Sequence, residues 1–205
     1  MVREFVGPPF VGPLDDGEDE QACSVARGGF SCLSQDPEAF LRSGMNRALI
    51  ELFDAGADIP ARAIAGLSQA ELNAFPVPGT WSIQQIIVHL WESDLAASHR
   101  MRRIIAEETP LLIAYDETAC AKALFYEQED IARVCRLFDD NRRMTADLLR
   151  RLPDAAFARV GIHNQRGKVS LADMVQIYVD HIRGHMVHLL RKREMLGKPI
   201  TIKVP

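Results

Sequence analysis

The chain has 205 residues, of which 47% are hydrophobic and 25% charged, as in an ordinary globular protein with enough residues for one well-filled core. A formal net charge of −4, with no basic cluster interleaved with aromatic residues, argues against a nucleic-acid partner. The sequence contains no long apolar run that would span a membrane and no basic start followed by an apolar core, as a signal peptide would need. None of the four cysteines forms a Cys-x-x-Cys pair, so we expect reduced thiols and a cytoplasmic protein.

The first 35 residues differ in composition from the rest of the chain. They contain turn and loop residues without a helical period: Gly7-Pro8-Pro9, Gly12-Pro13, the acidic run from Asp15 to Glu20, and Gly28-Gly29. We expect residues 1–35 to form an irregular N-terminal extension outside the main fold. A disordered tail is the default interpretation, and a lid or a clamp on a neighbouring subunit are the alternatives.

The pattern becomes helical from Asp36 onward. Asp36-Pro37-Glu38 offers an N-cap followed by proline at the first helical position, and Gly56 and Pro60 are expected to bend or split the helix that follows. A second helix is predicted from Ser82, which forms a capping box with Gln85, to about Ala106. Its core side carries Ile83, Ile86, Ile87, Leu90 and Leu95.

Two further helices complete the predicted fold. Apolar residues from Ile131 to Leu152 predict a third helix that Pro153 closes, and a loop or small hairpin is expected between Val160 and Val169. Ser170, three residues before Asp173, caps a final long helix. The sequence therefore predicts an all-α four-helix bundle over residues 36–198, followed by an extended C-terminal tail over residues 199–205.

Histidines lie on the apolar face of the predicted final helix. Steps of three, four and seven place these residues on one face: Met174, Ile177, Tyr178, His181, His185, His188 and Leu189. Neutral imidazole binds zinc, nickel, copper or iron, and two histidines four residues apart on a helix can converge on one ion. Ile182 follows His181 where a zinc protease has glutamate, so peptidase chemistry of that type is not expected.

A third histidine, His89, lies on the predicted second helix, on the same face as Ile86 and Ser93. Ligands from facing helices converge in the core of a bundle, so the predicted metal ligands are His89, His181 and His185. Three protein ligands leave a coordination position open for water or substrate, as in catalytic metal sites. Three separate, hydrogen-bonded core histidines are the alternative.

Other polar residues are assigned to the surroundings of this site. Glu92 and Tyr178 are candidates for a general base or a hydrogen-bond partner near the metal, against the alternatives of a solvated carboxylate and a half-buried aromatic residue. His188 is predicted to pack beside the site rather than to close it as a fourth ligand. His99 and His163 are expected at the surface.

Several segments resemble a known family. Gly79-Thr80-Trp81-Ser82-Ile83, followed by Ile87-Val88-His89-Leu90-Trp91-Glu92-Ser93-Asp94, resembles the G-x-W-S/T … H-x-x-(D/E)-S helix of the DinB superfamily. The segment from Tyr178 to His188 resembles the later H-x-x-x-H helix of that family. Glu108-Thr109-Pro110 and Tyr115-Asp116-Glu117 are similar to the YfiT-like branch, to which the bacillithiol S-transferases belong. The resemblance covers residues 45–198.

This resemblance implies a four-helix bundle, often a homodimer, in which His89, His181 and His185 bind a divalent metal, zinc or nickel. It implies a metal-dependent enzyme acting on a small molecule, and a transferase that joins a low-molecular-weight thiol to an electrophile is favoured over a hydrolase. A non-catalytic bundle that binds a metal or a small ligand is the alternative from another class, so whether the protein is an enzyme stays open.

Overall fold

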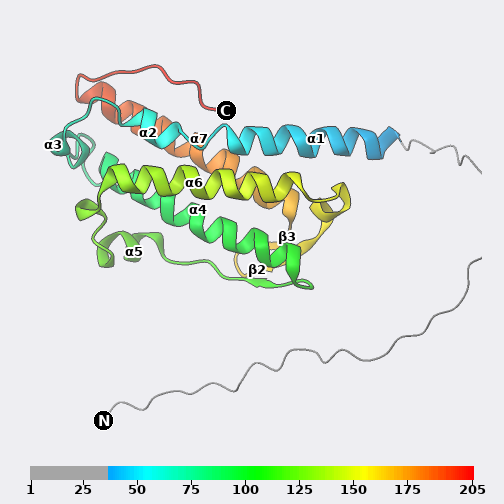
Figure 1. Cartoon of the computed structure of the whole chain (residues 1–205). Helices are drawn as coiled ribbons and strands as arrows, with labels where there is room; N and C mark the ends of the chain where they lie inside the picture. The colour runs from blue at the N-terminus through cyan, green and yellow to red at the C-terminus, as the bar shows by residue number, and fades with distance from the viewer. Residues whose placement is uncertain (1–36) are drawn as a thin grey trace, which may run out of the picture. The chain divides into compact units, whose positions relative to one another are not determined.

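The structure is a computed structural model that describes residues 37–205, with side chains described from residue 44. Its four long helices are α1 (Pro37–Asp54), α4 (Ile83–Ala106), α6 (Ile131–Arg150) and α7 (Leu171–Met195). Helices α1 and α4 each pack against both α6 and α7 (Figure 1). The predicted four-helix bundle is confirmed, whereas the expected extension over residues 1–35 lies outside the described residues.

The connections contain shorter elements, most of them not predicted. The helical ones are α2 (Ile59–Ala63), α3 (Gln69–Leu72), α5 (Glu117–Ala123), η1 (Tyr126–Gln128) and η2 (Asp154–Ala158). A small sheet joins β1 (Leu111–Leu112), β2 (Val160–His163) and β3 (Gly167–Ser170) in that order. The antiparallel pair β2–β3 is the predicted hairpin, and the parallel pair β1–β2 adds a strand that the all-α prediction lacks.

The long helices begin where the sequence predicts. The Ser82 hydroxyl accepts a hydrogen bond from the backbone N–H of Gln85, and Ser170 does the same with Asp173; both form complete capping boxes. The first helical segment is split as expected, since α1 ends at Asp54 and α2 follows with proline in its first turn.

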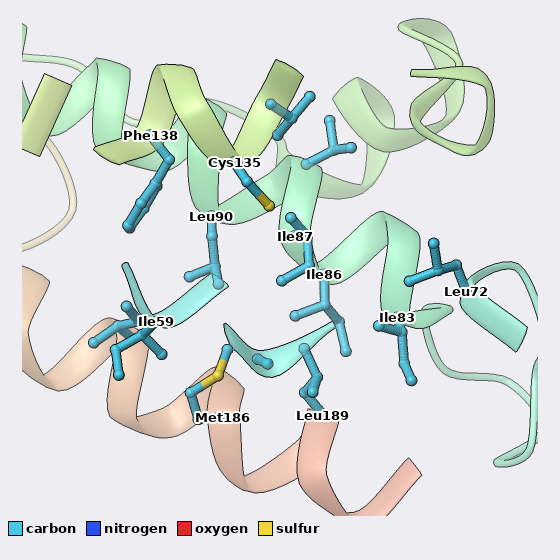
Figure 2. Packing of buried hydrophobic residues seen from close by; sticks show 14 of the residues in the cluster. Ile59, Leu72, Ile83, Ile86, Ile87, Leu90, Cys135, Phe138, Met186 and Leu189 are labelled. Atoms are coloured by element: carbon cyan, nitrogen blue, oxygen red, sulfur yellow. The ribbon is translucent and has the colours of Figure 1, made fainter. Parts of the chain in front are cut away.

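Buried hydrophobic residues form two clusters between the helices. Figure 2 shows one of them, to which α2, α4, α6 and α7 contribute Ile59, Ile87, Phe138 and Leu189, among others. The prediction that Leu95 faces the core is wrong, because its side chain is 50% exposed. Leu95 follows Leu90 by five residues, a rotation of about 140° around an ideal helix, which turns it away from the core.

A buried ion pair joins the helices next to this core. The Arg142 Nε atom of α6 donates to Asp94 Oδ1 of α4 at 3.0 Å, and both side chains are 1% exposed. The same guanidinium donates to the backbone carbonyls of Phe53 in α1 and Tyr178 in α7. Asn141 donates to the other carboxylate oxygen of Asp94. Arg142 therefore connects all four long helices.

Two expectations drawn from composition concern the described residues. Cys120 and Cys135 are free thiols, while Cys23 and Cys32 lie outside the described residues. No helix within residues 37–205 has the length and apolar character needed to cross a membrane. The domain boundaries at residues 36 and 198 stay predictions.

Candidate metal centre

The structure brings the three histidines of the sequence prediction together. His89 lies on α4, and His181 and His185 lie one turn apart on α7. The Nε2 atom of His181 is 3.2 Å from that of His89 and 3.0 Å from that of His185. One ligand atom from each residue can be chosen so that all three lie within 4.8 Å of one another.

These distances fit a shared metal ion better than hydrogen bonds between imidazoles. A neutral imidazole nitrogen either donates one proton or accepts through one lone pair, so His181 Nε2 completes a hydrogen bond with only one of its two neighbours. A divalent ion at about 2.0–2.1 Å from each nitrogen places tetrahedral ligand atoms roughly 3.3 Å apart. The donor set therefore suits a divalent metal ion.

Burial keeps the three imidazoles neutral. Loss of solvent lowers the pKa of His89 to about 3, of His181 to about 2 and of His185 to about 4, and neighbouring histidines add to the effect. Neutral imidazole is the form with a free lone pair for a metal. The cluster is therefore ready to coordinate an ion at neutral pH.

The ring of His89 packs against the aromatic ring of Trp81. Its ring centroid lies 4.8 Å from that of Trp81, and its side chain is fully buried. Its Nδ1 atom has no hydrogen-bond partner among the described residues. On α7, Tyr178 packs edge-on against the ring of His181, with centroids 5.7 Å apart.

A polar cavity of about 110 Å³ opens at His181. Its wall carries two guanidinium groups, those of Arg100 and Arg166, and the carboxylate of Glu117. The Glu117 Oε2 atom lies 3.7 Å from His89 Nε2, at the start of α5. Burial raises the pKa of Glu117, and Arg100 and Arg166 act in the opposite direction. The cavity thus joins the histidine cluster to a carboxylate and to two cations.

The two residues predicted to assist the metal have different surroundings. Tyr178 lines the cavity, and its hydroxyl accepts a hydrogen bond from Arg100 Nη1 at 2.9 Å. Burial raises the pKa of Tyr178. Glu92 is half-buried, does not line this cavity, and accepts a hydrogen bond of 2.7 Å from the hydroxyl of Tyr126. A catalytic role for either residue stays a prediction.

The remaining histidines give one correction. His163, expected at the surface, is only 6% exposed and forms part of the cavity wall. It is covered because its strand, β2, pairs with the unpredicted strand β1, where Leu112 lies opposite it. His188 is exposed, but it shares a cavity wall with His185 and is not part of the cluster, whereas His99 is exposed as expected.

Sequence reasoning missed the charged residues of the cavity. Arg100 follows His89 by eleven residues, which is a rotation of only about 20° on a helix, so helical spacing could have placed it near the site. Glu117 was noted only for its similarity to the YfiT-like branch. Arg166 lies in the turn between β2 and β3, and no local pattern reveals what it faces.

Comparisons with known proteins show the family to which the chain belongs. Residues 53–189 match the family model of the DinB superfamily. The chain belongs to the DinB superfamily. It is 25% identical over 144 residues to the "Putative metal-dependent hydrolase YfiT" of Bacillus subtilis, covering 68% of this chain and 81% of that protein. A protein of Oceanobacillus iheyensis, also named a metal-dependent hydrolase, is 28% identical over 126 residues, or 62% of this chain and 73% of that protein.

Solved structures show the same fold. The structure of YfiT from Bacillus subtilis, described as having "an unusual four-helix bundle topology", matches with a TM-score of 0.71 at 21% identity. The match covers 83% of this DinB-superfamily chain and 94% of YfiT. A mycothiol-dependent maleylpyruvate isomerase matches with a TM-score of 0.54 at 16% identity, over 74% of this chain and 60% of the isomerase.

Proposed function

We propose that the protein is a metal-dependent enzyme that joins a low-molecular-weight thiol to an electrophilic small molecule. His89, His181 and His185 are the proposed ligands of a zinc or nickel ion. The observation that carries the proposal is the cluster of three neutral imidazoles, one buried and two half-buried, beside a polar cavity with its own carboxylate. A divalent ion bound there supplies Lewis acidity, which favours the deprotonated form of a thiol or of water.

The side chains around the cavity suit the handling of a proton and of negative charge. Glu117 lies beside His89, and its raised pKa makes it a better proton acceptor than a carboxylate with the ordinary pKa. Arg100 and Arg166 can bind an anionic group of a substrate. Because Arg100 donates to the oxygen of Tyr178, the tyrosine O–H is oriented to donate to a ligand in the cavity. Glu92, bound to Tyr126, is the alternative base.

Two observations bear on the choice between transfer and hydrolysis. The mycothiol-dependent isomerase shares the fold, which favours a thiol as reactant. The curated relatives are named metal-dependent hydrolases, which favours water. Because of the fold shared with the isomerase, we propose thiol transfer first and hydrolysis as the second candidate. The same ligands and the same base would serve both reactions.

The first experiment is to measure the metal content of the purified, untagged full chain by elemental mass spectrometry, with His181→Ala as the matched variant. We expect about one zinc or nickel per chain in the wild type and none in His181→Ala. No metal in either protein, even after reconstitution, would overturn the proposal and leave three core histidines.

Activity assays then separate the candidates. Consumption of cysteine with the electrophile monochlorobimane, lost on chelation and restored by metal, supports a transferase. Metal-dependent cleavage of p-nitrophenyl esters without thiol consumption favours the hydrolase instead. Stoichiometric metal without either turnover favours a binding module and contradicts the enzyme proposal.

The proposed setting is the cytoplasm, where Cys120 and Cys135 stay reduced, and the proposed assembly is a homodimer. The dimer follows from the resemblance to the YfiT-like branch. Size-exclusion chromatography with light scattering tests the dimer. We expect a mass of twice the 22.9 kDa of one chain, and the mass of a single chain would contradict the dimer.

A further inference from the structure

A second cavity reaches the histidine cluster at His185. Its volume is about 380 Å³, and it shares no lining residue with the cavity at His181. Its wall combines apolar residues of α4 and the loop before it, Val77, Trp81 and Ile86, with His188, Arg191 and Lys192 of α7. The histidine cluster thus borders two separate cavities of different character.

Lys192 is the unusual residue of this cavity, which we call the Trp81 cavity. Its side chain belongs to α7 and is only 3% exposed, although an ammonium group is strongly favoured in water. Its Nζ atom donates to the hydroxyl of Thr80, and no carboxylate among the side chains described, residues 44–205, forms a salt bridge with it. Burial lowers the pKa of Lys192, and the adjacent Arg191 adds to that effect. A buried cation without a counter-ion is costly, so an anion from outside would stabilise it.

The hydrogen bond to the uncharged hydroxyl of Thr80 does not compensate the positive charge of Lys192. Thr80 is exposed at the end of the loop before α4, and a hydroxyl accepts equally well from an uncharged donor. Arg191, on the same wall, increases the positive charge instead of compensating it. The Trp81 cavity therefore combines an aromatic face, a basic end and access to His185.

The distance along α7 fixes the size of a fitting ligand. Lys192 follows His185 by seven residues, about 10 Å along an α-helix. A small molecule bound between them needs an apolar body of roughly that length, next to Trp81, and an acidic group at one end. An aryl-alkyl carboxylate has this chemistry.

We propose that the Trp81 cavity binds the electrophilic substrate as an organic carboxylate, with its acid group on Lys192 and its apolar body against Trp81. The assignment of this ligand as the second reactant rests on the proposed function, whereas binding of the carboxylate does not. Transfer between two molecules needs both reactants next to the same centre, and two cavities with separate walls meet that need.

Titration calorimetry with 4-phenylbutyrate on the full chain tests the proposal, before and after removal of metal. We expect binding that persists without metal and weakens about tenfold or more in Lys192→Met, because a charge-assisted hydrogen bond is lost. Lys168→Met, at an exposed lysine on β3 that lines neither cavity, is the matched control and should bind like the wild type. The neutral analogue 4-phenylbutanol should bind the wild type at least tenfold more weakly, a comparison that needs no variant.

Three outcomes would overturn binding of the carboxylate at Lys192. These outcomes are no binding to the wild type at millimolar concentration, equal binding of the alcohol, or unchanged affinity in Lys192→Met. Binding that requires metal and ignores Lys192 would make the carboxylate a metal ligand, leaving the metal site intact and this inference wrong. Conversely, Lys192-dependent binding to a protein that never takes up metal would support the cavity and contradict the proposed function.

Discussion

His181 is the central residue of the cluster, because its Nε2 atom lies near those of both other histidines. His89 is the most deeply buried of the three, and His185 borders the Trp81 cavity. Each imidazole therefore has a different neighbourhood although all three share one role in the proposed site. Substitutions at this scale separate the ligands from histidines that are merely close in sequence.

Removal of one ligand should abolish stoichiometric metal binding. We expect His185→Ala to retain well under one metal equivalent after dialysis, because two imidazoles seldom hold an ion without a further ligand. His99→Ala and His188→Ala, at exposed histidines on the same two helices, should keep a full equivalent by elemental analysis. A full equivalent on His185→Ala would refute the ligand assignment.

Glu117→Gln should separate proton transfer from metal binding. The amide keeps the shape of the side chain but cannot accept a proton, so we expect unchanged metal content and a kcat lower by about 10²- to 10⁴-fold. The acidic limb of the pH profile of kcat/KM should disappear as well. Glu108→Gln, at an exposed carboxylate, is the control. Loss of metal in Glu117→Gln would instead identify Glu117 as a ligand.

The histidines could be predicted from the sequence, because ligands on helices follow a period that the sequence displays. Among the charged cavity residues, Glu117 begins the short helix α5 and Arg166 lies in the hairpin turn, and their approach to the site depends on how distant segments meet. The burial of His163 shows the same limit, since it requires pairing between β1 and β2. Local patterns in the sequence predict the histidine cluster but not the walls of the cavity.

At the scale of elements, the turn between α1 and α2 packs closely against a side chain of α6. A Cβ atom added at Gly56 would lie 2.3 Å from Arg142 Nη1 and 3.2 Å from the carbonyl oxygen of Phe53. The guanidinium cannot move away easily, because it is bonded to Asp94 and to the carbonyl of Tyr178. Glycine at this position lets α1 approach the buried ion pair.

Gly56→Ala should therefore destabilise the fold. We expect a loss of about 1–3 kcal/mol in the free energy of unfolding, measured by urea denaturation, as for other overpacked sites. Gly44→Ala is the matched control, because nothing lies within 4 Å of its added Cβ and alanine favours the helix. Equal stability of Gly56→Ala and the wild type would show that Arg142 is free to shift.

The long helices were predictable because their capping boxes and apolar periods are local in sequence. The strand β1 was not, since two residues carry no period and their parallel partner comes much later in the chain. The short pairing between β1 and β2 forms only when these distant segments meet in the folded chain. The wrong prediction for Leu95 has another origin, because Leu95 does not follow the helical spacing of the other core residues of α4.

At the scale of the whole molecule, the lowered pKa values of the histidines link stability to pH. In the metal-free protein, the unfolded chain binds protons below its ordinary histidine pKa of about 6.5. The folded cluster resists protonation until about pH 4 or lower. Between these values the unfolded state holds more protons, so stability falls as the pH falls.

We expect the free energy of unfolding of the metal-free protein to decrease from pH 7 to pH 5, by at most about 1.4 kcal/mol per histidine per pH unit. Urea denaturation at several pH values measures this slope. His181→Gln should have a shallower slope, because one of the three groups is gone. Identical slopes for the two proteins would contradict the burial of His181 as a neutral imidazole.

The Arg142–Asp94 pair bears on the order in which the chain folds and takes up metal. It joins α4 and α6 and, through the carbonyl of Tyr178, fastens α7 one turn before His181. The helices that carry the three imidazoles are thus aligned by bonds that need no ion. We expect a newly made chain to reach its native shape unloaded and to acquire metal afterwards, so that supply of the ion would govern activation of the protein rather than its survival.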